Sequence, residues 1–341
     1  MKILLLQLKR IGDLILTTPA VAALRESFPD AQVTIAASSE CADILPAISN
    51  VDRTLMARRN LRDLSLFFSI AGRRFDYCID FTGNDRSAFL AFLSGAQRRL
   101  VSYRVREQSK RRGRAYTDFV PVRMRDFHTI DYNLALLEPL GIQTPASRAP
   151  HLLLPQAACE KADALRRDWK ITKPYVILHP GSARPEKLWE AGRWAELIDH
   201  FVRNNDIYLV LTSGPSANEQ AHVAAIKNKV QQQVIDFSGK TNLPTLAALI
   251  DQARLLVTVD SAPMHLAAAT RTPQVVLFGP TNPFHWRPRE SQALILQGKS
   301  PAPVTEFVPA QPRLAMSQIS TGTVISAMDS LLSLRATAQS S

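Results

Sequence analysis

Residues 2–8 read KILLLQL, and this stretch decides how the first part of the chain folds. The apolar run is short and stops before Gly12, which is typical of a buried strand followed by a turn. Pro19 then opens a helical stretch over 20–28, and a second strand is expected over 33–37. The order strand, turn, helix, strand predicts a parallel sheet covered by helices.

The same pattern recurs along the chain and predicts two α/β halves. The halves meet near a polar helix expected over 157–169. A last amphipathic helix over 323–334 is most simply a cap on the nearer domain, and 299–313 is a proline-rich loop without periodicity. Further strands are expected at 77–81, 175–178, 207–212, 255–259 and 274–278, with helices at 87–94, 194–204, 218–230, 243–252 and 263–270.

Composition agrees with two globular domains and points to an anionic partner. The 341 residues are 46% hydrophobic and 21% charged, which excludes a disordered or fibrous chain. The net charge of +11 suggests nucleic acid, an anionic membrane or a phosphorylated substrate. Residues 1–150 hold 22 basic and 15 acidic residues, so the excess is larger in the first half.

Cysteine use and hydropathy indicate a cytoplasmic protein. Cys41, Cys78 and Cys159 are far apart, which supports neither a disulfide framework nor a zinc ribbon. The apolar N-terminal run is too short for a secretory signal, and no stretch of 18 apolar residues occurs. The motifs GxGxxG, GxxxxGK[ST] and HExxH are also absent, which disfavours the usual dinucleotide fold, a P-loop and a zinc protease.

Asp13 follows the first expected strand and precedes a helix. Because α/β sheets place their sites at the carboxyl ends of strands, a carboxylate there can act as a general base. A capping or turn role is the alternative. The flanking Lys9 and Arg10 could keep the carboxylate ionised or bind an acceptor phosphate.

The strand at 255–259 ends in Asp260, and Ser261 suits an N-cap for the helix that follows. A helix N-terminus with small residues is a natural pyrophosphate site, whereas the Asp260 carboxylate would repel phosphate and bind sugar hydroxyls better. His265 is either a ligand-binding group or a buried structural histidine.

Two further strands end in polar groups. Lys187 follows the strand at 175–178 and its HPGS turn, and it suits a leaving diphosphate, although a lone loop lysine is usually only solvated. Glu219 follows Gly214 and could hold a ribose or simply supply first-turn helix charge. Residues 98–114 are rich in arginine and form either a phosphate site or a solvated basic face. Few aromatic residues occur there, so a base-stacking platform for nucleic acid is disfavoured.

Taken together, these segments resemble the ADP-heptose:lipopolysaccharide heptosyltransferases, glycosyltransferase family 9, and most closely the heptosyltransferase III branch. The resemblance covers nearly the whole chain. Its segments are GDLILTTPA at 12–20, IDFTGN at 79–84, HTIDYN at 128–133, HPGS at 179–182 with KLW at 187–189, LTSGP at 211–215, SGKTNL at 238–243, and VDSAPMH at 259–265 with FGPT at 278–281.

The resemblance implies a GT-B fold, in which two Rossmann-like α/β/α domains face each other across a cleft. Residues 1–160 would form the acceptor-binding domain and 161–320 the ADP-sugar-binding domain. The helix at 321–337 would pack back on the first domain, contrary to the simpler interpretation as a cap. The substrates would be ADP-heptose and a lipopolysaccharide core precursor, with no metal or other cofactor.

The resemblance also implies a role for individual residues. Asp13 would deprotonate the acceptor hydroxyl, which would attack the anomeric carbon in line and invert it. Lys9, Arg10, Arg86, Arg111 and Arg112 are acceptor or anion candidates. On the donor side, Ser182 and Lys187 would contact the diphosphate, and Asp260 would bind the heptose. Glu219 would bind the ribose, and Lys240 and Thr241 would contact the adenine. The phosphates would also be bound by the backbone amides of Ser261, Ala262, Pro263 and Met264, and His265 belongs to the same motif.

Two positions depart from the family pattern or leave it open. Many relatives carry cysteines in the loop before the last helix, where residues 301–316 have none. Asn218 could take the place of Glu219 as the ribose residue.

A transferase for another nucleotide sugar or acceptor is the first rival function, and a non-catalytic anion binder is the second. We expect a peripheral protein on the inner face of a Gram-negative inner membrane, with no nucleic-acid partner.

Overall fold

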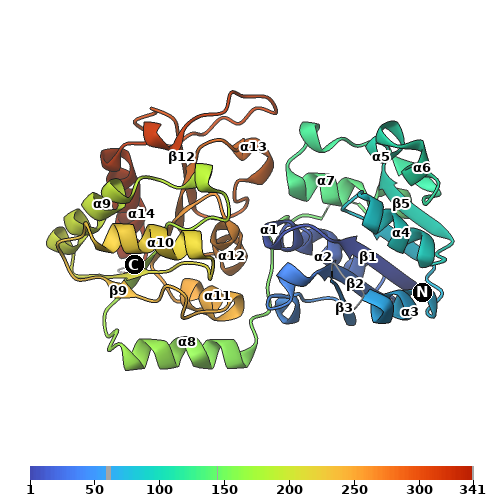
Figure 1. Ribbon diagram of the computed structural model, residues 1–341, viewed down its shortest axis with the longest axis horizontal. Helices are drawn as coiled ribbons and strands as arrows, with labels where there is room; N and C mark the ends of the chain where they lie inside the picture. The colour runs from blue at the N-terminus through green and yellow to red at the C-terminus, as the bar shows by residue number, and fades with distance from the viewer. Residues whose placement is uncertain (59–62, 144, 340–341) are drawn as a thin grey trace. The chain divides into compact units, whose positions relative to one another are not determined.

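The computed structural model describes residues 1–58, 63–143 and 145–339. The chain forms two compact units, Met1–Leu153 and Leu154–Ser341, each built on its own parallel sheet (Figure 1). The sequence places the boundary between 160 and 161, which lies inside helix α8 (Gln156–Asp168). Because α8 packs on α11 (Leu243–Asp251), the whole helix belongs to the second unit.

The first unit has a six-stranded sheet in the order β3-β2-β1-β4-β5-β6, and every pair is parallel. Its strands are β1 (Lys2–Gln7), β2 (Gln32–Ser38), β3 (Arg53–Ala57), β4 (Tyr77–Asp80), β5 (Arg98–Ser102) and β6 (Asp118–Val120). Its helices are α1 (Ile11–Ile15), α2 (Thr18–Ser27), α3 (Leu64–Ala71), α4 (Asp85–Leu93), α5 (Arg104–Gln108), α6 (Lys110–Gly113) and α7 (Thr129–Ala135).

The central strand β1 is where the expected pattern holds best. Ile3 to Leu6 are fully buried, because strands of a parallel sheet are covered by helices on both faces. One local expectation is wrong, because the turn expected around Gly12 is the short helix α1. The sequence analysis also did not predict strand β5, which begins at Arg98 and Arg99 of the basic segment.

The second unit has a sheet in the order β12-β11-β10-β7-β8-β9, again wholly parallel. Its strands are β7 (Tyr175–His179), β8 (Tyr208–Leu211), β9 (Ile235–Asp236), β10 (Leu255–Val259), β11 (Gln274–Phe278) and β12 (Ala293–Gln297). Its helices, besides α8 and α11, are α9 (Ala191–Asn204), α10 (Ala217–Lys227), α12 (Ala262–Thr270), α13 (Pro283–Trp286) and α14 (Thr321–Gln339).

The two sheets share one topology. Counted along the chain within each unit, both have the strand order 3-2-1-4-5-6, which reverses between β1 and β4 in the first and between β7 and β10 in the second. In open α/β sheets, ligands bind outside the carboxyl ends of the strands at this reversal. The topology therefore predicts one ligand-binding site in each unit, at the strand reversal.

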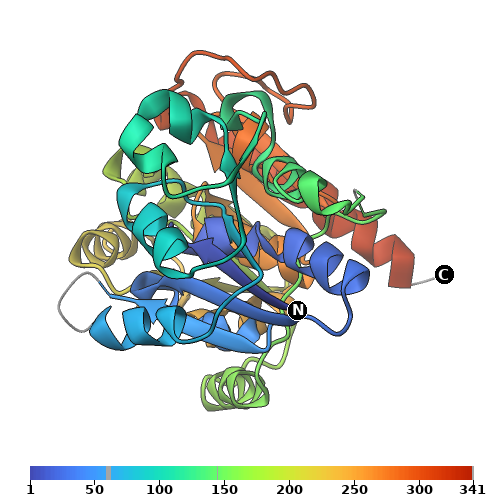
Figure 2. The same ribbon diagram turned by 90° about the vertical axis from the view of Figure 1, so that its right-hand side faces the viewer.

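The last helix packs within the second unit. Val324, Met328 and Leu331 of α14 join the core that includes Trp189 and Trp194. The helix contacts α9, β10, β11 and β12, and Figure 2 shows it, in red, beside the orange strands. Its expected packing on the first domain remains a prediction. Residues 299–313 form a loop without helix or strand, as the sequence predicts.

Candidate functional site

Asp13 lies at the third position of α1, just beyond the carboxyl end of β1. Its carboxylate accepts a hydrogen bond from the Arg10 backbone N–H at 3.3 Å, so it also caps the start of its helix. The side chain is nearly buried, and this burial raises the pKa of the Asp13 carboxyl, although the positive charge of Lys9 acts against it. A carboxylate whose pKa is raised in this way is a better proton acceptor than an ordinary surface aspartate.

A buried polar network fixes the backbone around Asp13. The Thr17 hydroxyl donates to the Asp13 carbonyl at 2.8 Å, and the Gln7 amide donates to the Thr17 hydroxyl at 2.8 Å. The Asn133 amide, from α7, donates to the Leu16 carbonyl at 3.1 Å. Because these donors are bonded and buried, the position of Asp13 relative to the sheet is closely held, although the Gln7 Oε1 has no partner among the described residues. Sequence reasoning gave no role to Gln7.

A second buried carboxylate, missed by sequence reasoning, ends β4 beside β1. Asp80 accepts from the backbone N–H groups of Thr82 and Gly83 at 2.7 and 3.0 Å and from the Tyr116 hydroxyl at 2.5 Å. Burial raises the pKa of Asp80. The Thr82 hydroxyl accepts from the Leu8 N–H at 2.7 Å, so this turn is tied to the chain leading into Asp13. In the sequence, the feature that could have identified Asp80 as a candidate is its position at the end of an expected strand.

The cationic candidates of the first unit fall into two groups. Arg86 pairs with Asp63, and Arg112 bonds Asp85 at 2.9 Å and the Gly83 carbonyl at 3.1 Å, so both already have protein partners. Arg10 and Arg111 are exposed, and Lys9 is partly buried near Asp13. Their roles toward an acceptor remain predictions.

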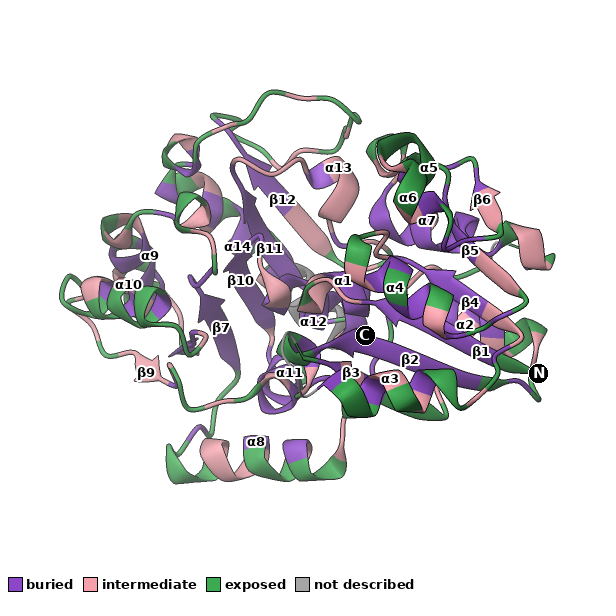
Figure 3. Cartoon of the chain, turned by 45° about the vertical axis from the view of Figure 1, so that its right-hand side comes forward, coloured by how far each residue is buried: buried purple, intermediate pink, exposed green. Residues whose placement is uncertain are grey.

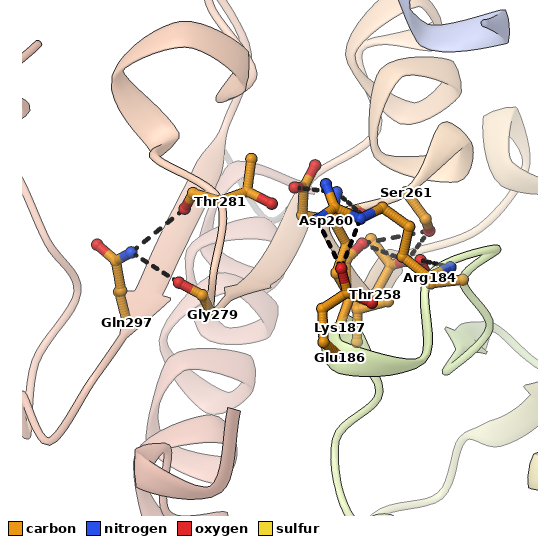
Figure 4. Close-up of polar contacts among 11 residues, drawn as sticks. Arg184, Glu186, Lys187, Thr258, Asp260, Ser261, Gly279, Thr281 and Gln297 are labelled. Carbon is orange, nitrogen blue, oxygen red and sulfur yellow. Dashed lines mark hydrogen bonds and ion pairs between the residues drawn. The ribbon is translucent and has the colours of Figure 1, made fainter. Parts of the chain in front are cut away.

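In the second unit, the structure brings Lys187 and Asp260 together at the strand reversal. The Lys187 Nζ lies 2.6 Å from the Asp260 carboxylate and also donates to the Asp260 carbonyl at 3.2 Å (Figure 4). Lys187 follows β7 and Asp260 follows β10, which are paired strands. The side chains are only 12% and 8% exposed, so this ion pair is largely shielded from water.

The N-terminus of α12 adjoins this ion pair. The Ser261 hydroxyl does not cap the helix, which corrects the expectation, because it donates to the Val259 carbonyl at 3.3 Å. Pro263 and Met264 are buried within the first turn, and Ala262 is partly exposed. The first turn of α12 consequently has no side-chain cap. Its backbone N–H groups can therefore donate to an anion.

His265 is buried one turn into α12. Desolvation lowers the pKa of His265 to about 4, so the imidazole is neutral at physiological pH. Among the described residues, its Nδ1 is buried without a hydrogen-bond partner. Its role remains open between ligand binding and structure.

Glu219 is buried in the first turn of α10, where two glycines make room for it. A Cβ at Gly181 or Gly214 would lie 2.5 Å from a Glu219 carboxylate oxygen, so neither position admits a side chain without moving it. The Ser216 hydroxyl donates to this carboxylate at 2.7 Å. Asn218 is exposed. Ser182, next to Gly181, is buried and accepts from the Arg184 N–H at 3.2 Å.

Lys240 and Thr241 lie in the segment after β9, whereas Lys187 follows β7 and Asp260 follows β10. The Lys240 Nζ is 4.0 Å from the centre of the Trp169 ring and donates to the Asp236 carbonyl at 2.8 Å. The Thr241 hydroxyl is buried and has no partner among the described residues. Trp169 is 42% exposed and was not singled out from the sequence.

Two hollows in the second unit flank the segment that holds Lys187. The first, of about 470 Å³, lies between 185–190 and 313–317; the second, of about 360 Å³, is lined by Arg184, 280–282 and 309–313. The proline-rich loop reaches them because the Asn282 amide donates to the Val308 and Pro309 carbonyls at 2.9 and 3.0 Å. The Gln297 amide donates to the carbonyls of Gly279 and Thr281, which precede the lining residue Asn282 (Figure 4).

Comparison with solved structures identifies the fold. A glycosyl transferase family 9 protein from Veillonella parvula has a TM-score of 0.84 and 25% identity, covering 98% of this chain and 97% of that one. The E. coli ADP-heptose lps heptosyltransferase II has a TM-score of 0.80 and 20% identity, covering 98% and 99%. The doubly repeated sheet with its polar strand ends is thus the fold of a GT-B glycosyltransferase.

Sequence comparison then defines the family. Residues 64–308 match glycosyltransferase family 9 (heptosyltransferase). Lipopolysaccharide heptosyltransferase 3 from Escherichia coli strain K12 is 32% identical over 293 residues, 81% of this chain and 82% of the relative. The chain belongs to glycosyltransferase family 9, the heptosyltransferases of lipopolysaccharide core biosynthesis. The resemblance seen in the motifs is confirmed.

The described part of the chain has neither a cluster of metal ligands nor a helix that could span a membrane. No three His, Cys, Asp or Glu side chains within 1–58, 63–143 and 145–339 gather as ligands for a metal ion. In the same residues, no helix is both long and apolar enough to cross a bilayer. The expectations of metal-free chemistry and of a peripheral membrane location remain predictions.

Proposed function

We propose that the enzyme transfers heptose from ADP-L-glycero-D-manno-heptose to the lipopolysaccharide inner core, with inversion and with Asp13 as general base. The observation that carries the proposal is the placement of Asp13. Its carboxylate is nearly buried at the strand reversal of the first unit, and burial raises its pKa. The similar E. coli protein is an ADP-heptose lps heptosyltransferase, which supports the choice of donor.

The proposed chemistry is a single displacement. Asp13 accepts the proton of the acceptor hydroxyl while that oxygen forms a bond to the anomeric carbon. The bond from this carbon to the diphosphate oxygen breaks on the opposite face, and ADP leaves with the electron pair. The sugar is inverted, and the proton remains on Asp13 until solvent removes it.

In this proposal the second unit binds the donor. The three protons of the Lys187 ammonium allow it to contact the diphosphate while keeping a bond to Asp260. The uncapped first turn of α12 adds positive potential beside it, and Ser182 contributes a hydroxyl. Asp260 then binds heptose hydroxyls, Glu219 the ribose, and Lys240 and Thr241 the adenine edge. No cofactor is required, because cationic and dipolar groups stabilise the leaving ADP.

The excess positive charge of the first unit supports an anionic acceptor. We assign this charge to a phosphorylated, lipid-anchored acceptor on an anionic inner-membrane surface, and therefore place the enzyme on the cytoplasmic face. Nucleic acid is the less favoured partner, because Tyr103 is the single aromatic residue of the basic segment 98–114 on which a base could stack.

A donor panel with the purified enzyme tests this proposal. Turnover is expected with ADP-heptose and a core acceptor, and the product should have the inverted anomeric configuration. Turnover with a different nucleotide sugar and none with ADP-heptose would favour the first rival. Binding of ADP and core acceptor without turnover of any donor would favour the non-catalytic anion binder.

A further inference from the structure

The outer faces of α3 and α4 are apolar, unlike those of ordinary surface helices. Leu64 and Phe68 on α3 are 57% and 77% exposed, and Phe89 and Phe92 on α4 are 49% and 65% exposed. A helix at the surface of a soluble domain normally turns charged and polar side chains outward. Figure 3 shows exposed residues, in green, on both helices.

These four side chains form one surface, which we call the aromatic face. Leu64 and Phe68 are four residues apart and Phe89 and Phe92 three apart, so each pair lies on one side of its helix. The two helices contact each other, and the Phe67 and Phe89 rings meet edge to face with centres 5.3 Å apart. On α3, Leu66 and Ile70 are buried toward the sheet, so the core does not need Leu64 or Phe68. Clustered exposed apolar groups of this kind mark an interaction site.

Exposed cations adjoin the aromatic face. Helix α6 contacts α4, and Arg112 joins the two through its 2.9 Å ion pair with Asp85 and its bond to the Gly83 carbonyl. Lys110, Arg111 and Arg114 in and next to α6 are exposed. The Asp85 carboxylate is the acidic group at this junction and is paired with Arg112, so the unpaired charge there is positive.

Apolar side chains beside exposed lysines and arginines are the combination that binds anionic lipid. The apolar groups enter the boundary between headgroups and acyl chains, and the cations contact lipid phosphates. A second copy of this chain is less favoured, because two rims of the same positive charge repel each other. The charge complementarity therefore favours a membrane over self-association.

We propose that the aromatic face of α3 and α4, with Lys110 and Arg111 of α6, docks the first unit on an anionic phospholipid surface. The inference rests on the proposed function only in that a lipid-anchored acceptor gives the enzyme a reason to bind a membrane. It assigns the contact to specific side chains, with Phe68 and Phe92 inserting and Arg112 serving to hold α6 against α4.

The test uses the full chain and sedimentation with vesicles of phosphatidylglycerol and phosphatidylcholine. The double variant Phe68→Ser/Phe92→Ser should bind these vesicles at least about tenfold more weakly, because it removes two apolar side chains from the lipid contact. Lys110→Ala/Arg111→Ala should weaken binding by about tenfold at low salt and less at high salt. Val308→Ser, an exposed apolar residue of the second unit, is the matched control and should bind as the wild type does.

Two further measurements separate this proposal from others. With a water-soluble core acceptor, which needs no membrane contact, the Phe68→Ser/Phe92→Ser variant should transfer heptose at the wild-type rate. If the wild-type enzyme itself were inactive on that acceptor, the result would count against the proposed function and not against docking. Unchanged vesicle binding in the double variant overturns the docking proposal. A wild-type dimer that the same variant converts to monomer, without a change in vesicle binding, assigns the face to self-association instead.

Discussion

The two units repeat one strand order but differ chemically where that order reverses. Between β1 and β4, the Asp13 carboxylate takes its hydrogen bond from a backbone N–H and has a raised pKa. Between β7 and β10, the Asp260 carboxylate is bonded directly to the Lys187 ammonium at 2.6 Å. The same topology therefore presents a desolvated proton acceptor in one unit and a shielded ion pair in the other.

The shared fold positions a polar side chain at each strand reversal, and the surroundings of that side chain determine its chemical properties. A buried carboxylate without an ammonium partner is suited to take a proton. A lysine held by an aspartate beside an uncapped helix is suited to bind an anion. The predictions below test whether the two roles can be removed separately.

The largest expected effect comes from Asp13→Asn. Asparagine keeps an oxygen that can accept from the Arg10 N–H but cannot take the acceptor proton. The rate of heptose transfer should fall by roughly 10²–10⁴-fold. The affinity for ADP, measured by calorimetry, should not change, because the donor site that we propose lies in the other unit.

Asp30→Asn is the matched control, since Asp30 is exposed in the same unit beyond α2. It should have wild-type transfer and binding. If Asp13→Asn were as active as this control, the base assignment would be wrong.

Lys187→Ala should have the next largest effect and the opposite signature. Removing a charge-assisted bond to the diphosphate should weaken ADP binding by roughly 10–100-fold. Lys229→Ala removes an exposed lysine from the same unit and should bind ADP normally. Equal affinities in the two variants would remove Lys187 from the donor site.

Glu219→Gln and Asn218→Ala resolve which of two adjacent residues holds the ribose. Glu219 is buried between Gly181 and Gly214, whereas Asn218 is exposed. We expect about tenfold weaker ADP binding for Glu219→Gln, from one lost charge-assisted hydrogen bond, and no change for Asn218→Ala. The reverse pattern in a titration would move the assignment to Asn218.

The smallest expected effect concerns stability and pH. Burial raises the pKa of Asp13 in the folded chain above its ordinary value of 3.8, so the folded state binds more protons than the unfolded state just above that value. The free energy of unfolding of the wild type therefore falls as pH rises through the folded pKa. Asp13→Asn lacks this loss and should melt at a higher temperature at neutral pH, with the difference disappearing in acid. A lower melting temperature at neutral pH would contradict the assigned desolvation.

The sequence predicts the sheets well because their strands are local apolar runs. Residues 255–259 and 274–278 have the bounds of β10 and β11, and the run at 2–8 contains β1. Helix α1 was missed because Gly12 and Asp13 are residues typical of turns. In the structure, the Leu14 N–H donates to the Arg10 carbonyl and the Arg10 N–H donates to the Asp13 carboxylate, and both bonds mark the helix start.

Strand β5 was missed for a different reason, which also bears on the basic segment. Arg98 bonds Asp118 on the neighbouring β6 at 2.6 Å, and Arg99 bonds the Ala115 carbonyl at 2.6 Å. In the sequence these arginines look like surface charge, because Asp118 of β6 and Ala115, which precedes that strand, come next to β5 only in the folded sheet.

The site was predictable residue by residue but not as an arrangement. Lys187 and Asp260 were both singled out, yet their contact joins residues 73 positions apart and depends on the pairing of β7 with β10. The role of Gly181 and Gly214 in making room for Glu219 likewise requires three segments in space. Such contacts follow from topology, which local patterns do not encode.

The most direct test of the proposed activity is mass spectrometry of the core oligosaccharide from a strain that lacks this protein. We predict that one heptose, with anything attached beyond it, is missing. The wild-type gene and the Asp30→Asn variant should restore it, and Asp13→Asn should not, although that protein is present at normal levels. An unchanged core in the deletion strain, or full restoration by Asp13→Asn, would contradict this account.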